Sequence, residues 1–239
     1  MAKRYILILD AGTSGPRCFV FDNTCKPVGY SKNKWVHLKE SNVPSFAHAF
    51  DLRSTQKSIG TLIKKSIQSA GISHREIAAV SVTSQRQGVV FLDKSGLEIY
   101  GGPNLDLRAV FEGASIDEQM GNRVYQTTGH LPSFLFSMAK LRWFQIHQPE
   151  SYDRIAHVLP LGDWLAWKLT NTLASEITLA SEAGLVDIHR REFCSDILND
   201  LELINNPIPL VRAGTIVGYV TANGDIDTGL LPGTPVAVA

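Results

Sequence analysis

Two apolar runs joined by a short turn of small residues open this chain and place the strongest constraint on its fold. The stretch reads YILILDAGTSGPRCFVFDN. Residues 5–9 are all apolar, which is typical of a strand buried on both faces. A second β-prone run follows at residues 17–22. Because the connection is so short, we expect the two strands to be antiparallel neighbours.

The turn between these runs carries side chains suited to a metal-bound triphosphate. Gly12 lets the main chain approach a ligand, and consecutive backbone N–H groups in such a turn form a concave anion site. Thr13 and Ser14 add hydroxyl groups, Asp10 suits Mg²⁺, and Arg17 suits phosphate oxygens. An ordinary polar hairpin turn is the alternative, because Gly and Ser are common in turns and the pattern is neither a Walker A motif nor GxGxxG.

Composition limits the partners. Lys plus Arg and Asp plus Glu each number 23, so we expect no nucleic acid held by bulk charge. The three cysteines, Cys18, Cys25 and Cys194, are too few and too irregular for a disulfide framework, and we expect free thiols in a reducing compartment. The first apolar run ends at Asp10, and no apolar stretch approaches the roughly 18 residues of a membrane span. The sequence therefore predicts a cytoplasmic protein without membrane contact.

Strand and helix patterns alternate through the rest of the chain. The sequence predicts strands at 28–35, 77–84, 88–93 and 155–161, helices at 49–70, 110–127, 136–147, 162–169 and 192–201, and a strand, loop and strand in the Gly- and Thr-rich tail. This order is typical of an α/β fold with a mixed sheet. With no internal repeat or linker in 239 residues, we expect one compact domain.

Seven segments occur in the same order as in one known family. DAGTSGPRCFVFD resembles the first phosphate-binding hairpin of the FGGY family of carbohydrate kinases, which belongs to the actin-like (RNase H-like) ATPase superfamily. KLRWFQIHQPE and LASEITLASEAGLVDIHRREF are similar to a helix and to a Ser- and Ala-rich stretch of that family. IAAVSVTSQRQGVVFLDKSG resembles the strand that ends at the substrate, and PNLDLRA is similar to its Trp-x-Asp-x-Arg segment. GDWLAWKLTN and AGTIVGYVTANGDIDTGLLPGTPVAVA resemble a later helix and the end of the first domain. The resemblance covers essentially the whole chain.

The resemblance implies an α/β fold of the actin-like ATPase (RNase H-like) type, with a mixed central sheet, an antiparallel first hairpin and helices on both faces. It also implies ATP and Mg²⁺ as cofactors and transfer of the γ-phosphoryl group to a hydroxyl of a sugar or polyol. Asp10 would help to hold Mg²⁺, Gly12, Thr13 and Ser14 would face the phosphates, and Arg17 would lie near them. The protein would mainly position the reactants and neutralise charge.

Substrate-binding residues are expected at the end of the 77–84 strand, where α/β sheets commonly bind ligands. Gln85, Arg86 and Gln87 lie there, and the five donors of Arg86 suit two neighbouring hydroxyls. Glycerol kinases of the family carry Glu where Gln87 stands, so glycerol is a less expected substrate. Asn104 replaces the family's tryptophan, which favours a smaller or more polar substrate. Asp106 has two interpretations, a bond to substrate or a cap on the next helix.

Three further polar residues are expected to have structural or surface positions. We interpret Arg108 as structural and Asp163 as the N-cap of its helix. His130 follows a glycine in a loop, and we expect it at the surface rather than at the substrate.

The family's general base is an aspartate in a Gly-rich turn just after GTPV, and the chain stops at Ala239 within that stretch. The resemblance therefore implies that residues 1–239 are the N-terminal domain and that a C-terminal domain is the missing partner, through a shortened chain or a split gene. Alone, the chain is expected to be inactive, and its uncovered face makes a homodimer possible. The alternatives are a non-catalytic nucleotide- or sugar-binding module and another actin-like ATPase, such as a chaperone domain. The Gln85-Arg86 step and GDWLAWKLTN argue against the latter.

Overall fold

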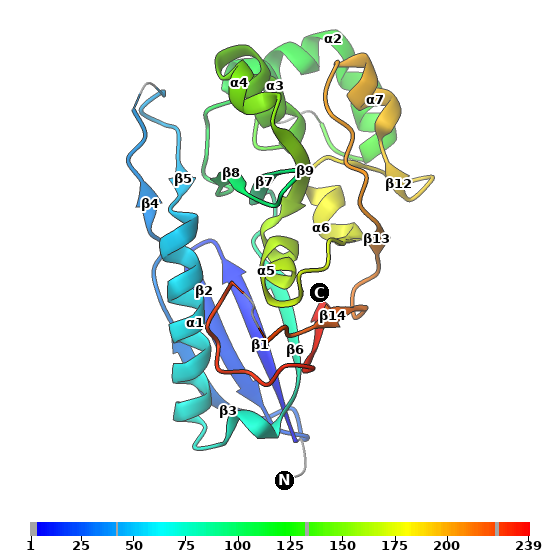
Figure 1. The fold of residues 1–239 in the computed structure, drawn as a ribbon. Helices are drawn as coiled ribbons and strands as arrows, with labels where there is room; N and C mark the ends of the chain where they lie inside the picture. Colours follow the sequence, from blue (N-terminus) through cyan, green and yellow to red (C-terminus); the bar gives the residue numbers. More distant parts are fainter. Residues whose placement is uncertain (1–3, 42, 132–133, 223–224) are drawn as a thin grey trace.

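A six-stranded mixed sheet forms the base of the molecule (Figure 1). The structure, a computed structural model, describes residues 4–41, 43–131, 134–222 and 225–239. β1 pairs with β2 and β2 with β3 in antiparallel fashion, whereas β6 runs parallel to β1. The strands, in spatial order, are β14 (Ile216–Tyr219), β15 (Pro235–Val238), β6 (Ile77–Ser84), β1 (Tyr5–Gly12), β2 (Gly15–Phe21) and β3 (Pro27–Lys32).

Two helices pack against this sheet. α1 (Leu52–Ser69) lies along β2 and β3, and α5 (Leu161–Thr170) lies along β6, β14 and β15. α1 forms because its apolar residues recur at helical spacing and Asp51 caps its first turn by accepting a hydrogen bond from the Ser54 N–H. The mixed sheet, the antiparallel first hairpin and the flanking helices confirm the predicted fold class.

A second, three-stranded antiparallel sheet lies above the first (Figure 1). β7 (Val89–Asp93) is its central strand, between β8 (Glu98–Gly102) and β9 (Ile155–Pro160). Its core is a separate apolar cluster in which Phe91 and Phe144 pack together. Its helices are α2 (Val110–Thr128), α3 (Ser137–His147), α4 (Pro149–Tyr152) and α7 (Ser195–Asp200). The sequence predicted β7 and β9 as strands, but not that they leave the main sheet.

Several predicted boundaries are wrong, and short elements were missed. The third strand ends at Lys32. The predicted helix 49–70 begins only at Leu52, because Ala49 and Phe50 form a strand before the Asp51 cap. The predicted helix 192–201 begins only at Ser195. The remaining short elements are β4 (His37–Leu38), β5 (Ala49–Phe50), a 3₁₀ turn (His74–Glu76), β10 (Ser175–Glu176), α6 (Ile177–Glu182), β11 (Val186–Asp187), β12 (Glu192–Phe193) and β13 (Leu210–Val211).

The three cysteines differ in their burial. All three cysteines are free. Burial raises the pKa of the Cys18 and Cys194 thiols to about 12, whereas Cys25 is exposed. Within the described ranges, no helix is long and apolar enough to cross a membrane.

Asp163 does not cap its helix as predicted. α5 begins at Leu161, after Pro160, so Asp163 lies inside the first turn and is buried. Its Oδ2 accepts hydrogen bonds from the Ser175 hydroxyl at 2.8 Å and from the Glu176 N–H at 3.0 Å. Glu176 is itself the N-cap of α6. Asp163 therefore ties α5 to the start of α6, and burial raises the pKa of its carboxyl to about 8.

This buried carboxyl should make folding stability fall as pH rises. The unfolded carboxyl loses its proton near pH 4, whereas folded Asp163 keeps it until about pH 8. Its stabilising contribution is therefore complete below pH 4 and is lost progressively between pH 4 and pH 8. Urea unfolding of the wild type and of Asp163→Asn at pH 5, 6, 7 and 8 should show the gap between them closing or reversing toward pH 8. A constant gap would contradict the assignment.

Candidate functional site

The ends of β1 and β6 bring the two predicted halves of the site together. Ala11 and Ser84 are register partners in these parallel strands, and the Gln85 N–H donates to the Ala11 carbonyl at 2.9 Å. Parallel neighbours end at the same edge of a sheet, so the β1–β2 turn and the segment after β6 lie side by side. A cavity of about 620 Å³ opens there. Its walls are formed by Asp10, Gly12, Thr13, Arg17, Ser84, Gln85, Arg86, Gln87, Asn104, His130 and Glu182.

Glycine shapes the β1–β2 turn. Gly12 and Gly15 are register partners, so Thr13 and Ser14 form a two-residue hairpin loop. Gly15 has φ +139°, and a Cβ there would collide with the Asn33 carbonyl, so only glycine fits. A Cβ on Gly12 would lie 3.1 Å from Arg17 Nη2 and 3.4 Å from Asp10 Oδ1. The missing side chain leaves a cradle beside both charged groups. Of the predicted turn residues, only Ser14 does not line the cavity.

Asp10 and Arg17 face each other across the hairpin and form an ion pair. Both side chains remain partly exposed to the cavity, so each can exchange its partner for a charged ligand. Within the described ranges, no three His, Cys, Asp or Glu side chains are grouped to hold a metal. Asp10 supplies one carboxylate to the cavity, and Mg²⁺ can be held by one carboxylate with waters and phosphate oxygens as its other ligands.

The substrate side is linked to the turn by side-chain amides. Gln85 Oε1 accepts from the Asn104 N–H at 3.1 Å, and Asn104 Nδ2 donates to Thr13 Oγ1 at 3.0 Å. Gln85 Nε2 and Asn104 Oδ1 are buried without a hydrogen-bond partner among the described residues. Leaving such groups unpaired is costly. Both atoms are shielded from solvent, so a ligand hydroxyl, which can both accept and donate, would reach them only if the amide side chains rotate toward the cavity.

Glu182 and His130 also line the cavity, and sequence reasoning missed both. Glu182 ends α6, and its carboxylate lies 3.7 Å from Arg86 Nη1, whose side chain is 72% exposed. His130 was expected at the surface, but its ring packs edge-on against Phe136 at the cavity wall. No local pattern marks either residue, because each reaches the cavity through tertiary packing. The Gly129 that ends α2 with φ +74° is the only nearby signal, since it turns the chain at His130.

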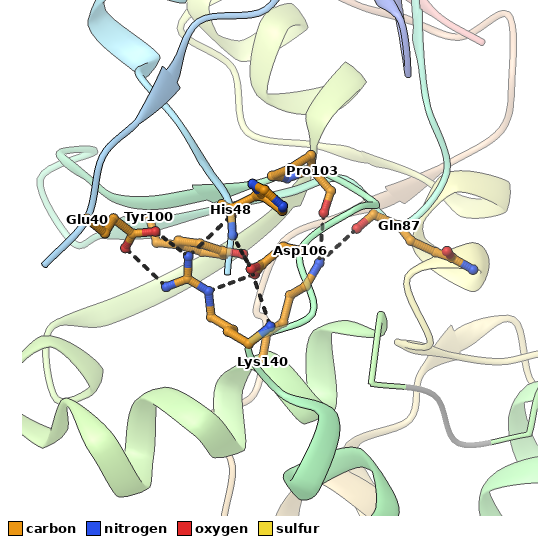
Figure 2. Close-up of polar contacts among 8 residues, drawn as sticks. Glu40, His48, Gln87, Tyr100, Pro103, Asp106 and Lys140 are labelled. Atoms are coloured by element: carbon orange, nitrogen blue, oxygen red, sulfur yellow. Dashed lines mark hydrogen bonds and ion pairs between the residues drawn. The ribbon is translucent and has the colours of Figure 1, made fainter. Parts of the chain in front are cut away.

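Asp106 lies outside the cavity, in a buried cluster (Figure 2). Its carboxylate accepts from the His48 N–H at 2.8 Å, from Arg108 Nε at 2.7 Å and from the Tyr100 hydroxyl. The capping interpretation is wrong, because α2 begins after Ala109 and has no side-chain cap. The position of Asp106 separates it from the other predicted substrate residues.

Arg108 is structural, as predicted. Its guanidinium is fully buried, bonds Glu40 Oε2 at 2.6 Å and lies over the Tyr100 ring with 4.4 Å between Cζ and the ring centroid. Burial and the neighbouring Asp106 carboxylate raise the pKa of Tyr100 well above its usual range, so its hydroxyl remains a donor.

A sequence model of the FGGY family of carbohydrate kinases, N-terminal domain, matches residues 5–239. The chain belongs to this family. Autoinducer-2 kinases of Klebsiella pneumoniae and Salmonella typhimurium are each 31% identical to it over 239 residues, with 98% of this chain covered in both. Those matches cover 44% and 45% of the two relatives. The FGGY chain thus spans less than half the length of the curated relatives it matches.

Solved FGGY kinases share the fold. Xylulose kinase from Rhodospirillum rubrum superposes with a TM-score of 0.88 at 22% identity, over 99% of this chain and 49% of that one. Gluconate kinase from Lactobacillus acidophilus gives a TM-score of 0.87 at 16% identity, over 97% of this chain and 46% of that one.

Proposed function

We propose that residues 1–239 form the N-terminal domain of an ATP-dependent carbohydrate kinase, which transfers the γ-phosphoryl group of ATP to a hydroxyl of a sugar or polyol. The observation that carries the proposal is the Asn104–Thr13 hydrogen bond. It joins a turn suited to phosphate and a wall suited to hydroxyl groups within one cavity. Phosphoryl transfer requires such adjacency, because the attacking hydroxyl must lie close to the transferred group.

The turn would hold the nucleotide's phosphates. Asp10 would hold Mg²⁺, which when bound neutralises phosphate charge. Arg17 would leave Asp10 and pair with phosphate oxygens. The single Asp10–Arg17 ion pair would then be replaced by two, one between Asp10 and Mg²⁺ and one between Arg17 and phosphate. Gly12 and Thr13, which line the cavity, would present backbone N–H and hydroxyl groups to the same oxygens, and the phosphate contact expected of Ser14 stays a prediction.

The opposite wall would hold the sugar. Gln85 and Asn104 would rotate to pair with a hydroxyl through the amide atoms that lack partners, and Arg86 and Gln87 would donate to its neighbours. Glu182 would accept a hydrogen bond from a sugar hydroxyl beside Arg86 and keep this wall close to neutral overall. Asp106, which is buried behind this wall, would not contact the sugar directly. The curated relatives make autoinducer-2 the first compound to assay, with xylulose, gluconate and glycerol beside it.

A second domain would supply the general base. Both carboxylates that line the cavity, Asp10 and Glu182, already face an arginine. The face of the main sheet that carries Ile6, Tyr30 and Ile216 is also open, and these side chains are 45%, 45% and 55% exposed. An apolar face of this kind fits a covering partner. We propose that the general base lies in a segment beyond Ala239. A homodimer and a cytoplasmic location stay predictions.

An assay of the protein encoded by the complete reading frame tests the proposal. That protein should release ADP from Mg·ATP only when one of the sugars or polyols is added, and the isolated 239-residue chain should not. Calorimetry with Mg·ATP and each sugar should then show binding by the complete protein. Binding without turnover would support a non-catalytic module instead. The absence of both binding and turnover would refute the proposal.

Glu182 should set the preference between neutral and anionic substrates. Glu182→Lys places a second cation beside Arg86, so KM for a neutral polyol should rise roughly 10-fold, which is the cost of one lost polar contact. Aldonates such as gluconate should gain by comparison. Steady-state kinetics on both compounds would show the shift. Glu118→Lys on the exposed face of α2 makes the same charge change away from the cavity and should leave both KM values unchanged. Equal effects at the two positions would contradict a local role.

A further inference from the structure

Lys140 is a fully buried lysine behind the sugar wall of the cavity. It lies in the first turn of α3, and no carboxylate of the described residues is within ion-pair distance of its ammonium. Its Nζ donates instead to two backbone carbonyls, Gln87 O and Pro103 O, each at 3.3 Å (Figure 2). Burying an ammonium away from a direct counter-charge is costly. These two bonds therefore offset an unfavourable burial.

Both carbonyls belong to the segments that carry the sugar-binding residues. The peptide group between Pro103 and Asn104 is held on both sides, because its carbonyl accepts from Lys140 and its N–H donates to Gln85 Oε1. Gln87 has φ +64°, a left-handed conformation that is unfavourable for any residue with a Cβ. Its carbonyl is the one that Lys140 binds. One side chain thus fixes a strained residue beside Arg86 and the peptide before Asn104.

We propose that Lys140 is a positioning residue for the sugar site, which holds segments 85–88 and 103–104 at a fixed separation so that Gln85, Arg86 and Asn104 converge on one ligand. The identity of the ligand rests on the function proposed above. The link that Lys140 makes between the two segments does not depend on that function. A displacement of about 1 Å between groups that bind one ligand can cost up to roughly 100-fold in activity.

Burial is the main influence on the pKa of the Lys140 ammonium, and two neighbouring charges act on it in opposite directions. Asp106 favours the charge, whereas Arg108 opposes it, and Tyr100 and Glu40 complete the cluster (Figure 2). Burial lowers the pKa of Lys140 to about 8. A charged donor makes stronger hydrogen bonds to carbonyls than a neutral one.

Amide hydrogen exchange on a Lys140→Met variant tests the structural link. Methionine keeps the length and apolar stem and removes the donors. We expect the Asn104 and Gly88 amides to exchange roughly 10-fold faster than in the wild type, which is the loss expected for one charged hydrogen bond. Lys168→Met is the matched control, because Lys168 is also buried but pairs with Glu98 and Asp225, away from the cavity. It should destabilise the fold without a selective change at Asn104 and Gly88. No change in Lys140→Met, or an equal change in Lys168→Met, would overturn the inference.

Binding by the complete protein tests the link to the sugar. Lys140→Met should raise the Kd for the sugar roughly 10-fold to 100-fold and leave the Kd for Mg·ATP within about twofold. An unchanged sugar Kd would overturn the positioning role. If the wild type binds no sugar, the proposed function fails, and hydrogen exchange alone decides whether Lys140 holds the two segments.

A measurement on the wild type covers the case in which Lys140→Met does not fold. In protein labelled at lysine Nζ, the Lys140 ammonium signal should be protected from solvent and should shift when xylulose or autoinducer-2 is added, while the Lys168 signal stays in place. A Lys140 signal that exchanges as fast as those of surface lysines would also overturn the inference.

Discussion

Replacing Asp106 with alanine should lower the free energy of unfolding by about 3 to 5 kcal/mol, the range for breaking a buried ion pair from one side. Its carboxylate is fully buried and accepts from His48, Tyr100 and Arg108. Without it, the Arg108 guanidinium keeps only Glu40 as an acidic partner. The Lys140 ammonium also loses the nearby negative charge that favours it. Urea denaturation followed by circular dichroism would measure the loss.

A surface aspartate provides the control for this stability change. Asp200→Ala breaks the pair with Arg123, in which both side chains are about half exposed, and should cost at most about 1 kcal/mol. The double variant Asp106→Ala, Arg108→Met should recover part of the loss, because the unpaired guanidinium is then gone. Similar costs for Asp106→Ala and Asp200→Ala would show that the Asp106 cluster does not support the fold.

Replacing Asp10 with asparagine should reduce kcat of the complete protein by roughly 10²-fold to 10³-fold, the range for removing one group that stabilises transition-state charge. Asparagine has the same shape and keeps an oxygen, but it lacks the charge that Mg²⁺ prefers. The proposed loss of Mg²⁺ would leave the phosphate charge unneutralised. Steady-state assays across a Mg²⁺ series, with nucleotide binding measured beside them, would record both effects.

Asp227→Asn is the matched control for Asp10→Asn. Asp227 is a highly exposed aspartate that pairs with Lys64 at 2.7 Å and does not line the cavity. Its variant should keep the wild-type kcat and Mg²⁺ dependence. Full activity in Asp10→Asn would refute the role given to Asp10, and the phosphate side of the site would then have to be sought elsewhere.

The parts of the site that follow strand ends could be predicted from sequence. A continuous apolar run that ends at Asp10, with Gly12 just beyond, predicts a strand and a tight turn, and the structure has both. Burial on both faces was wrong, because Leu7 and Leu9 are buried whereas Ile6, on the other face of β1, is 45% exposed. Gln85 was placed in the same way, at the end of β6. Such predictions succeed because strand direction and turn chemistry are local properties, and parallel pairing then brings the two ends together.

The parts that depend on packing between distant segments could not be predicted. Glu182 meets Arg86 only because Asp163 and Glu176 fix the start of α6. Asp106 shares a short motif with Asn104. The Asp106 side chain nevertheless belongs to a buried cluster, whereas Asn104 lines the cavity wall. Lys140 stands in a helix where the ordinary expectation for a lysine is a surface position. Each outcome is set by tertiary burial, which has no local pattern.

The contact between Asn104 and Thr13 has a thermodynamic consequence. Thr13 Oγ1 accepts a hydrogen bond from the Asn104 side-chain amide, so its own O–H is left to donate in another direction. A hydroxyl that accepts a hydrogen bond becomes a better donor, since such chains polarise one another. A ligand bound at one wall of the cavity should therefore raise the affinity of the other wall for its own ligand. By linkage, the two increases in affinity must be equal. One threonine hydroxyl would thus couple the binding of the two ligands, with equal effects on both affinities.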